Sequence, residues 1–215
     1  MIQFMPPDVT VYVVLDPILS KGRTHEEVAA MAIAGGASVI QLRDKQASVR
    51  ELCEIGRRIK ALTVRTGAHF IVNDRVDIAL AIDADGVHLG QDDLPAGLAR
   101  DILGPRRILG VSVENGDQAR RAARAGATYV AIGPIYEARG SKADAGAPIG
   151  VEAITELRKH TRLPIVAIGG INHDRVADVA RAGADGAAVI SAIVSATDIT
   201  EATREMKRLF LAAKA

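Results

Sequence analysis

Short runs of apolar, often β-branched residues alternate along this chain with longer segments whose apolar side chains recur every three or four positions. The short runs predict buried strands, and the longer segments predict amphipathic helices that cover them. Eight strands are predicted, at 10–15, 38–42, 69–72, 86–89, 108–111, 129–132, 164–168 and 186–190. Helices are predicted at 26–34, 49–65, 118–125, 151–160 and 175–182, with a terminal helix at 200–213.

One unit repeats: an alanine-rich helix end, a glycine and then a β-branched run. Gly36, Gly126 and Gly183 each precede such a run, and Asp83 stands in a weaker copy. Because the residue after a helix often takes a left-handed conformation, which favours glycine, these positions predict helix ends. Eight strand–helix units in series predict an α/β fold, a single-domain (β/α)₈ TIM barrel over residues 1–215. The alternative is a doubly wound sheet, but its glycine-rich turn would follow the first strand, where the chain reads Asp16-Pro17-Ile18-Leu19.

Composition and charge exclude several functions. The chain has 27 Lys and Arg against 26 Asp and Glu, so no positive field favours nucleic acid. Residues 1–7 lack a basic region, and the apolar run at 9–15 is too short to cross a bilayer. The only cysteine, Cys53, is interpreted as a packed core thiol. We expect a cytoplasmic protein without a nucleic-acid or membrane partner; a homodimer is the commonest symmetric assembly.

In such a barrel the active site lies at the carboxyl ends of the strands. After the second strand, Gln41, Arg43 and Lys45 share one face by strand alternation, which suits a polyphosphate; a solvated charged loop is the alternative. Asp74 and Asp93 follow the third and fourth strands, where converging carboxylates can hold Mg²⁺. Alternatively each aspartate caps the helix that follows, and Asp92 would fit that role better if Asp93 is the ligand.

The seventh and eighth strand exits are where many barrels bind phosphate. Gly169 and Gly170 allow the backbone to approach an anion closely, and Ser191 begins a helix whose free amides favour negative charge. The alternative is that the glycines only end a strand. His88 lies within a strand and is expected to be a packed, hydrogen-bonded core residue.

Taken in order, the motifs at the strand exits resemble those of the thiamine-phosphate synthase family. They are Gln41-Leu42-Arg43-Asp44-Lys45, Val72-Asn73-Asp74-Arg75, Val87-His88-Leu89-Gly90-Gln91-Asp92-Asp93-Leu94, Gly110-Val111-Ser112, Gly133-Pro134-Ile135-Tyr136, Ala167-Ile168-Gly169-Gly170-Ile171 and Val189-Ile190-Ser191-Ala192-Ile193. That family joins hydroxymethylpyrimidine diphosphate to a thiazole phosphate, forming thiamine phosphate and releasing pyrophosphate.

The resemblance implies a role for each matching residue. Asp74 and Asp93 are expected to bind one Mg²⁺ that also bridges the diphosphate, and Ser112 and Lys142 are expected to act in catalysis. Those implied to hold the pyrimidine diphosphate are Gln41, Arg43, Lys45, Asn73, Ser112 and Lys142. Those implied to hold the thiazole phosphate are Arg139, Ser141, Gly170, Ile190 and Ser191. The substrates are therefore expected to be small phosphorylated molecules.

The loop after the sixth strand departs from the family's pattern. The family commonly shows Thr-x-Thr-Lys there, whereas this chain reads Glu137-Ala138-Arg139-Gly140-Ser141-Lys142. Alignment on Lys142 places Arg139 and Ser141 at the threonine positions and implies one additional residue upstream. Because residues 138–148 contain glycines and few apolar side chains, we expect a mobile lid that brings Lys142 to the pyrophosphate when it closes.

Two other functions compete with the synthase. Thiazole tautomerase, a metal-independent isomerase on the same barrel, is disfavoured because it lacks the Gly90-Gln91-Asp92-Asp93 stretch and typically carries a histidine near Glu114. A non-catalytic protein that binds thiamine precursors is disfavoured by the Asp74 and Asp93 pair, since a binder has no evident need for a metal.

Overall fold

The computed structural model describes residues 6–137 and 146–215. Three residues of the predicted site, Arg139, Ser141 and Lys142, lie outside these ranges, as does most of the predicted lid. Of that predicted lid, the described residues 146–148 are exposed to solvent.

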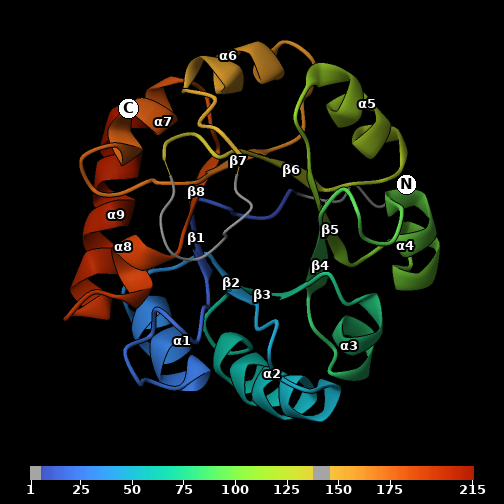
Figure 1. Ribbon diagram of the computed structural model, residues 1–215, viewed down its shortest axis with the longest axis vertical. Coiled ribbons are helices and arrows are strands. Elements are labelled where there is room, and N and C mark those ends of the chain that lie inside the picture. Colours follow the sequence, from blue (N-terminus) through green and yellow to red (C-terminus); the bar gives the residue numbers. More distant parts are fainter. Residues whose placement is uncertain (1–5, 138–145) are drawn as a thin grey trace.

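Within the described residues, eight parallel strands close into a barrel in the order of the sequence, with helices around the outside (Figure 1). The ring closes where β1 pairs with β8, with Val11 beside Ala187. The predicted barrel and each of its strands are confirmed, with ends shifted by at most a residue or two. The strands are β1 Val11–Val14, β2 Val39–Leu42, β3 His69–Asn73, β4 Gly86–Leu89, β5 Ile108–Ser112, β6 Tyr129–Ile132, β7 Ile165–Ile168 and β8 Gly186–Val189.

The two helices that follow β1 and β2 begin at side chains that cap their first turns. Thr24 with Glu27, and Ser48 with Glu51, form capping boxes that start α1 and α2. The sequence analysis gave no bounds for two helices, α3 and α4, which have six and eight residues. The helices are α1 His25–Ala34, α2 Val49–Thr63, α3 Val76–Ala81, α4 Ala96–Leu103, α5 Gly116–Arg124, α6 Glu152–Arg158, α7 Val176–Arg181, α8 Ser191–Val194 and α9 Ile199–Lys214.

The repeated glycines adopt the conformation that the repeat predicts. Gly36, Gly126 and Gly183 have φ angles of 94°, 84° and 100°, in the left-handed region where a residue without Cβ is unstrained. In the weaker copy Asp83 takes this conformation, with φ of 53°. These residues turn the chain sharply from the end of a helix into the next strand, which keeps the connections at this end of the barrel short.

The core has two layers because strand side chains alternate between the barrel lumen and the helices. The outer layer, between strands and helices, includes Val13, Leu42 and Phe70, and Cys53 packs against it as predicted. The lumen layer includes the rings of Tyr12 and Tyr129. Two of the three tyrosines in the chain therefore lie inside the barrel, directly below the strand exits.

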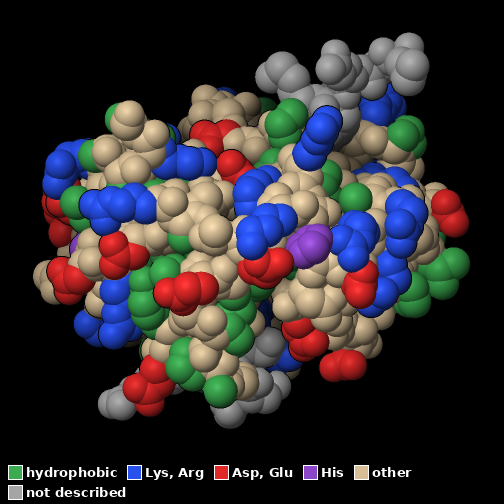
Figure 2. Space-filling view, turned by 90° about the horizontal axis from the view of Figure 1, so that it is seen from above, with side chains coloured by type: hydrophobic (Ala, Val, Ile, Leu, Met, Phe, Trp, Pro, Cys, Tyr) green, Lys and Arg blue, Asp and Glu red, His purple; other side chains and the backbone are tan. Residues whose placement is uncertain are grey.

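The outer surface is mixed in charge. On the face shown in Figure 2, basic and acidic side chains are interspersed. Among the described residues, no helix is long and apolar enough to cross a membrane.

Candidate active site

Arg43 leaves β2 toward the neighbouring exit of β1. Its Nη1 lies 3.7 Å from Oδ2 of Asp16, a carboxylate that is only 3 % exposed. The other oxygen of Asp16 accepts hydrogen bonds from the backbone amides of Ile18 and Leu19, at 2.9 and 3.1 Å. Asp16 is thereby fixed and holds the guanidinium in place. Sequence reasoning missed this partner, although an aspartate directly after the first strand was a visible signal.

Asp44 points away from Arg43 and Lys45, as strand alternation predicts. Its Oδ2 lies 3.1 Å from Nε2 of His25 at the start of α1. Its Oδ1 accepts from the backbone amides of Gln46 and Ala47. Burial raises the pKa of Asp44, but these hydrogen bonds, led by that of His25, outweigh burial and lower it. The ionised Asp44 therefore braces the loop that carries the two cations.

Asp74 and Asp93 converge at the exits of β3 and β4. Burial, followed by a hydrogen bond to Asp93 and that residue's charge, raises the pKa of Asp74 to about 6. The nearby charges of Lys45 and Arg43 act in the opposite direction. Two carboxylates and two cations thus gather at one side of the barrel mouth. Among the described residues no group of three or more His, Cys, Asp or Glu side chains is placed to hold a metal ion.

The helix-cap alternative for these aspartates is wrong. The N-cap of α3 is Arg75, and that of α4 is Pro95; neither end has a side-chain cap. Asp92 is exposed and three residues too early to cap α4. Asp93 instead accepts a 2.6 Å hydrogen bond from the amide of Gly90, which turns its carboxylate back toward the barrel mouth.

The remaining residues predicted on this side line the lumen. Gln41 is buried and donates to the Tyr12 hydroxyl at 2.7 Å. Asn73 ends β3 beside His88 of β4. Ser112 ends β5, with its Oγ 3.0 Å from Nε2 of His88. His88 is therefore hydrogen-bonded within the barrel, which confirms that prediction, but it also contacts a residue of the predicted site.

The exits of β7 and β8 lie across the barrel from those of β3 and β4 (Figure 1). Gly170 has φ of 62°, and a Cβ there would lie 2.5 Å from the backbone oxygen of Glu137. The glycine is therefore required for packing as well as being suited to anion approach. Ile190 precedes the four-residue α8, whose first residue, Ser191, is exposed.

Arg175 adds a cation to this second side that sequence reasoning missed. Its Nη1 donates to the carbonyl of Gly170 at 2.9 Å, and its guanidinium lies 4.8 Å from the centre of the Tyr136 ring. No local motif marks this arginine, because its approach to the β7 exit depends on the turn before α7.

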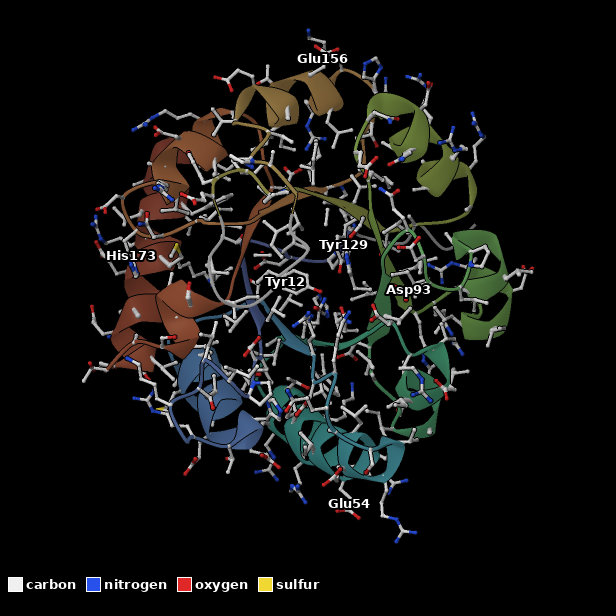
Figure 3. The ribbon with its side chains drawn as sticks, viewed as in Figure 1. Tyr12, Glu54, Asp93, Tyr129, Glu156 and His173 are labelled. Atoms are coloured by element: carbon white, nitrogen blue, oxygen red, sulfur yellow. The ribbon has the colours of Figure 1, made fainter. Side chains whose placement is uncertain are left out.

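Figure 3 shows Tyr12 and Tyr129 at the centre of the barrel, with Asp93 nearer its edge. An ionic cluster at β2–β4, two glycines at the exit of β7 and a polar lumen between them are the features of a (β/α)₈-barrel enzyme, a class whose active sites lie at the carboxyl ends of the strands. The chain belongs to the thiamine monophosphate synthase family, whose model matches residues 11–193.

Relatives with this family's activity in their names match nearly the whole chain. A thiamine-phosphate synthase of Chloroflexus aurantiacus is 52 % identical over 202 residues, covering 94 % of this chain and 93 % of the relative. One from Moorella thermoacetica is 51 % identical over 208 residues, covering 97 % and 99 %. The solved thiamine phosphate pyrophosphorylase of Pyrococcus furiosus has a TM-score of 0.89 and 38 % identity, covering 98 % of this chain and 99 % of its own.

Proposed function

We propose that this chain is a thiamine-phosphate synthase. It would condense 4-amino-2-methyl-5-(diphosphooxymethyl)pyrimidine with 4-methyl-5-(2-phosphooxyethyl)thiazole, releasing diphosphate. The observation that carries the proposal is the pair of sites on opposite sides of one barrel mouth, Arg43 and Lys45 with the two aspartates on one side and the β7–β8 exits on the other. Two phosphorylated substrates need two such sites, and the relatives' names support the same reaction.

Mg²⁺ fits the chemistry of the aspartate pair. Asp74 and Asp93 would hold the ion: burial, with the hydrogen bond and charge of Asp93, raises the pKa of Asp74 to about 6, and a bound cation would offset the cost of ionising this carboxyl group. Mg²⁺ typically takes one or two carboxylates and completes its shell with water and substrate phosphate. When bound, the ion neutralises charge on the diphosphate as it leaves.

The chain's own residues then stabilise and position the reactants. Arg43 and Lys45 provide positive charge for the departing diphosphate, and Lys142 is proposed to add to it. Gly170, Ile190 and Ser191, with Arg139 and Ser141 proposed from the outer loop, would hold the thiazole phosphate so that the ring nitrogen faces the pyrimidine methylene. The bond to diphosphate breaks and leaves a cation on the pyrimidine methylene, which the thiazole nitrogen captures. Water has to be excluded from this cation, because it would otherwise capture it.

The proposed setting follows from the substrates. They are small phosphorylated molecules, and a lone cysteine suits a reducing compartment, which supports action in the cytoplasm. The tautomerase alternative is not favoured, because the relatives at about half identity over nearly full length are named as synthases.

Incubation of the purified protein with both precursors and Mg²⁺ tests the proposal directly. Thiamine phosphate and diphosphate should form in equal amounts, and omission of either precursor should abolish both products. Isomerisation of the thiazole without condensation would establish the tautomerase instead. Binding of both precursors without any product would establish the non-catalytic alternative.

A further inference from the structure

A continuous chain of hydrogen bonds crosses the barrel lumen beneath the site. Gln41 Nε2 donates to the Tyr12 hydroxyl at 2.7 Å, and Tyr12 lies 2.8 Å from the Tyr129 hydroxyl. Tyr129 lies 2.9 Å from His88 Nδ1, and His88 Nε2 lies 3.0 Å from Ser112 Oγ. The five side chains come from β2, β1, β6, β4 and β5, so the chain joins two residues predicted to bind the pyrimidine.

The direction of this chain is set at its Gln41 end. An amide nitrogen only donates, so the Tyr12 oxygen accepts from Gln41. Either tyrosine hydroxyl could donate to the other, and the direction that leaves no buried proton without an acceptor runs from Tyr12 to Tyr129. The proton of Tyr129 is then directed to His88 Nδ1. A neutral imidazole that accepts at Nδ1 carries its proton on Nε2 and donates it to Ser112 Oγ. With its oxygen accepting from His88, the Ser112 hydroxyl can donate its own proton to another acceptor.

Burial holds this direction in place. The side chains of Tyr12 and Tyr129 are 2 % and 1 % exposed, and burial raises the pKa of both, so each hydroxyl keeps its proton. A reversed bond would leave a buried donor or acceptor unsatisfied, which is unfavourable in the barrel interior. The barrel also makes room for the chain: a Cβ at Gly110 would lie 2.1 Å from Cζ of Tyr129.

We propose that this chain fixes the Ser112 hydroxyl as a hydrogen-bond donor to a ring nitrogen of the pyrimidine substrate. Tyr12, Tyr129 and His88 are then positioning residues for pyrimidine recognition. This inference rests on the proposed function, because it assigns the recognised group to that substrate. A diphosphate oxygen is an acceptor of the same kind, and the binding experiment below distinguishes the two.

The first test is independent of any substrate. Nitrogen-15 NMR of the free protein at neutral pH, with the His88 signals assigned from a His88→Gln variant, should show a protonated Nε2 and an unprotonated Nδ1. Tyr129→Phe removes the donor to Nδ1 and should produce a mixture of tautomers. An Nδ1-protonated His88 in the unaltered protein would overturn the proposed direction, whatever reaction the enzyme performs.

The second test measures binding by calorimetry with Mg²⁺ and without the thiazole, so that no turnover occurs. Tyr129→Phe should raise the Kd for the pyrimidine diphosphate by roughly five- to tenfold, the equivalent of one hydrogen bond. The Kd for inorganic pyrophosphate should change by less than about twofold by the same reasoning. An equal loss for both ligands would assign the donor to the diphosphate and overturn the ring assignment.

A matched control separates recognition from general loss of packing. Thr203 is fully buried on α9, far from the site, and its hydroxyl donates to the Ile199 carbonyl at 2.7 Å. Thr203→Val therefore removes a buried hydroxyl of the same kind, and it should lower thermal stability without changing the Kd for the pyrimidine diphosphate. A similar loss of affinity in this variant would show that the effect of Tyr129→Phe is structural.

A double-mutant cycle tests whether the tyrosine acts through Ser112. In a Ser112→Ala background, Tyr129→Phe should change the Kd by less than about twofold, because the donor that it positions is already gone. Independent, additive losses in Kd would show that Tyr129 does not act through Ser112.

The His88 variants give a further test of the hydrogen-bond chain. His88→Gln, which keeps a donor near the Nε2 position, should retain more affinity for the pyrimidine diphosphate than His88→Asn. If Tyr129→Phe does not fold, the Kd values of His88→Gln, His88→Asn and Tyr12→Phe for the pyrimidine diphosphate still test the proposal. If the unaltered protein does not bind the pyrimidine diphosphate, the proposed function fails while the NMR result still tests the hydrogen-bond direction.

Discussion

Asp74 holds its carboxyl group in surroundings that disfavour its charge. Burial and the neighbouring Asp93 raise its pKa to about 6 from an ordinary value of 3.8. Between about pH 4 and pH 6 the folded protein therefore binds more protons than the unfolded chain, and stability falls as pH rises through that window. A residue that destabilises the folded protein in this way is typical of a position kept for function.

Replacement of Asp74 should consequently stabilise the metal-free protein. We expect Asp74→Asn to raise the free energy of unfolding at pH 7 by about 1 kcal/mol, a value reduced for partial solvent screening, with no gain near pH 4. Urea unfolding at the two pH values measures this, with the exposed Asp92→Asn as control. Lower stability of Asp74→Asn at pH 7 would show that the carboxylate serves the fold.

The raised pKa of Asp74 also leads to a prediction of how Mg²⁺ changes the thermal stability of the protein. Addition of Mg²⁺ with pyrophosphate should raise the melting temperature at pH 8 and less so at pH 5, where Asp74 is mostly protonated and cannot act as a ligand. Asp74→Asn and Asp93→Asn should each remove this shift and abolish Mg²⁺-dependent turnover while remaining folded. Full activity in either variant would remove that aspartate from the metal site.

Arg43 and Lys45 allow a test of which side of the barrel mouth binds the diphosphate and which binds the thiazole phosphate. Each lies on the side of the barrel that we propose binds the diphosphate, so Arg43→Ala and Lys45→Ala should weaken binding of Mg²⁺ pyrophosphate by about tenfold or more, the loss expected for a charge-assisted hydrogen bond. Binding of the thiazole phosphate should be unchanged. Calorimetry with each ligand measures this, and Arg57→Ala, on the exposed surface of α2, matches the change in charge. Selective loss of thiazole phosphate binding would reverse the assignment of the two sides.

At the scale of elements, β5 and β6 pack together because a glycine on β5 leaves space for a tyrosine ring on β6. Gly110 pairs with Tyr129 across the two strands, and the ring occupies the space that a side chain at position 110 would need. Gly110→Ala should destabilise the protein by about 1–3 kcal/mol through overpacking. The loss should be smaller in Gly110→Ala/Tyr129→Leu than the sum of the single changes, since the second change frees space. Additive losses in denaturant unfolding would contradict this account.

The segment that follows β2 is held by contacts with residues of the neighbouring β1 exit and of α1. Asp16 orients Arg43, and His25 with Asp44 fastens the segment between β2 and α2. Both partnerships link elements that are adjacent in the barrel but separated along the chain. The position of Arg43 and of the segment after β2 is therefore determined partly by Asp16 and His25.

At the scale of the whole molecule, the first and last elements close the same structure. β1 pairs with β8, and α9 packs Met206 and Phe210 into the outer core. Lys207 of α9 donates to the carbonyl of Gly36, which follows α1, at 3.0 Å. The first and last strands pair with each other and the last helix packs against the same core, so both ends of the described fold contribute to one cooperative unit.

The molecule should accordingly unfold in one step. We expect a single denaturant transition that coincides for circular dichroism and tyrosine fluorescence, with equal calorimetric and van't Hoff enthalpies. Magnesium pyrophosphate should move the whole transition without splitting it. Two separate transitions would contradict the single-domain prediction for residues 1–215.

The sequence by itself determined the order and type of the longer elements and the strand exits that carry polar residues. Strand runs, capping residues and the glycines after helices are local signals, so Gly36, Gly126 and Gly183 could be interpreted without knowledge of distant contacts. The placement of Asp74 and Asp93 at neighbouring exits followed from the barrel topology that these signals predicted.

Only the tertiary structure decided which side chains meet. The pairing of Asp16 with Arg43, of His25 with Asp44, and of Arg175 with the β7 exit depends on which elements become neighbours after closure. The hydrogen-bond chain through Tyr12 and Tyr129 depends in addition on which face of each strand points into the lumen. Residues more than 100 positions apart meet there, since the Tyr12–Tyr129 separation in sequence is 117. Periodicity within a single strand holds no information about such a contact, because the contact exists only once the ring is closed.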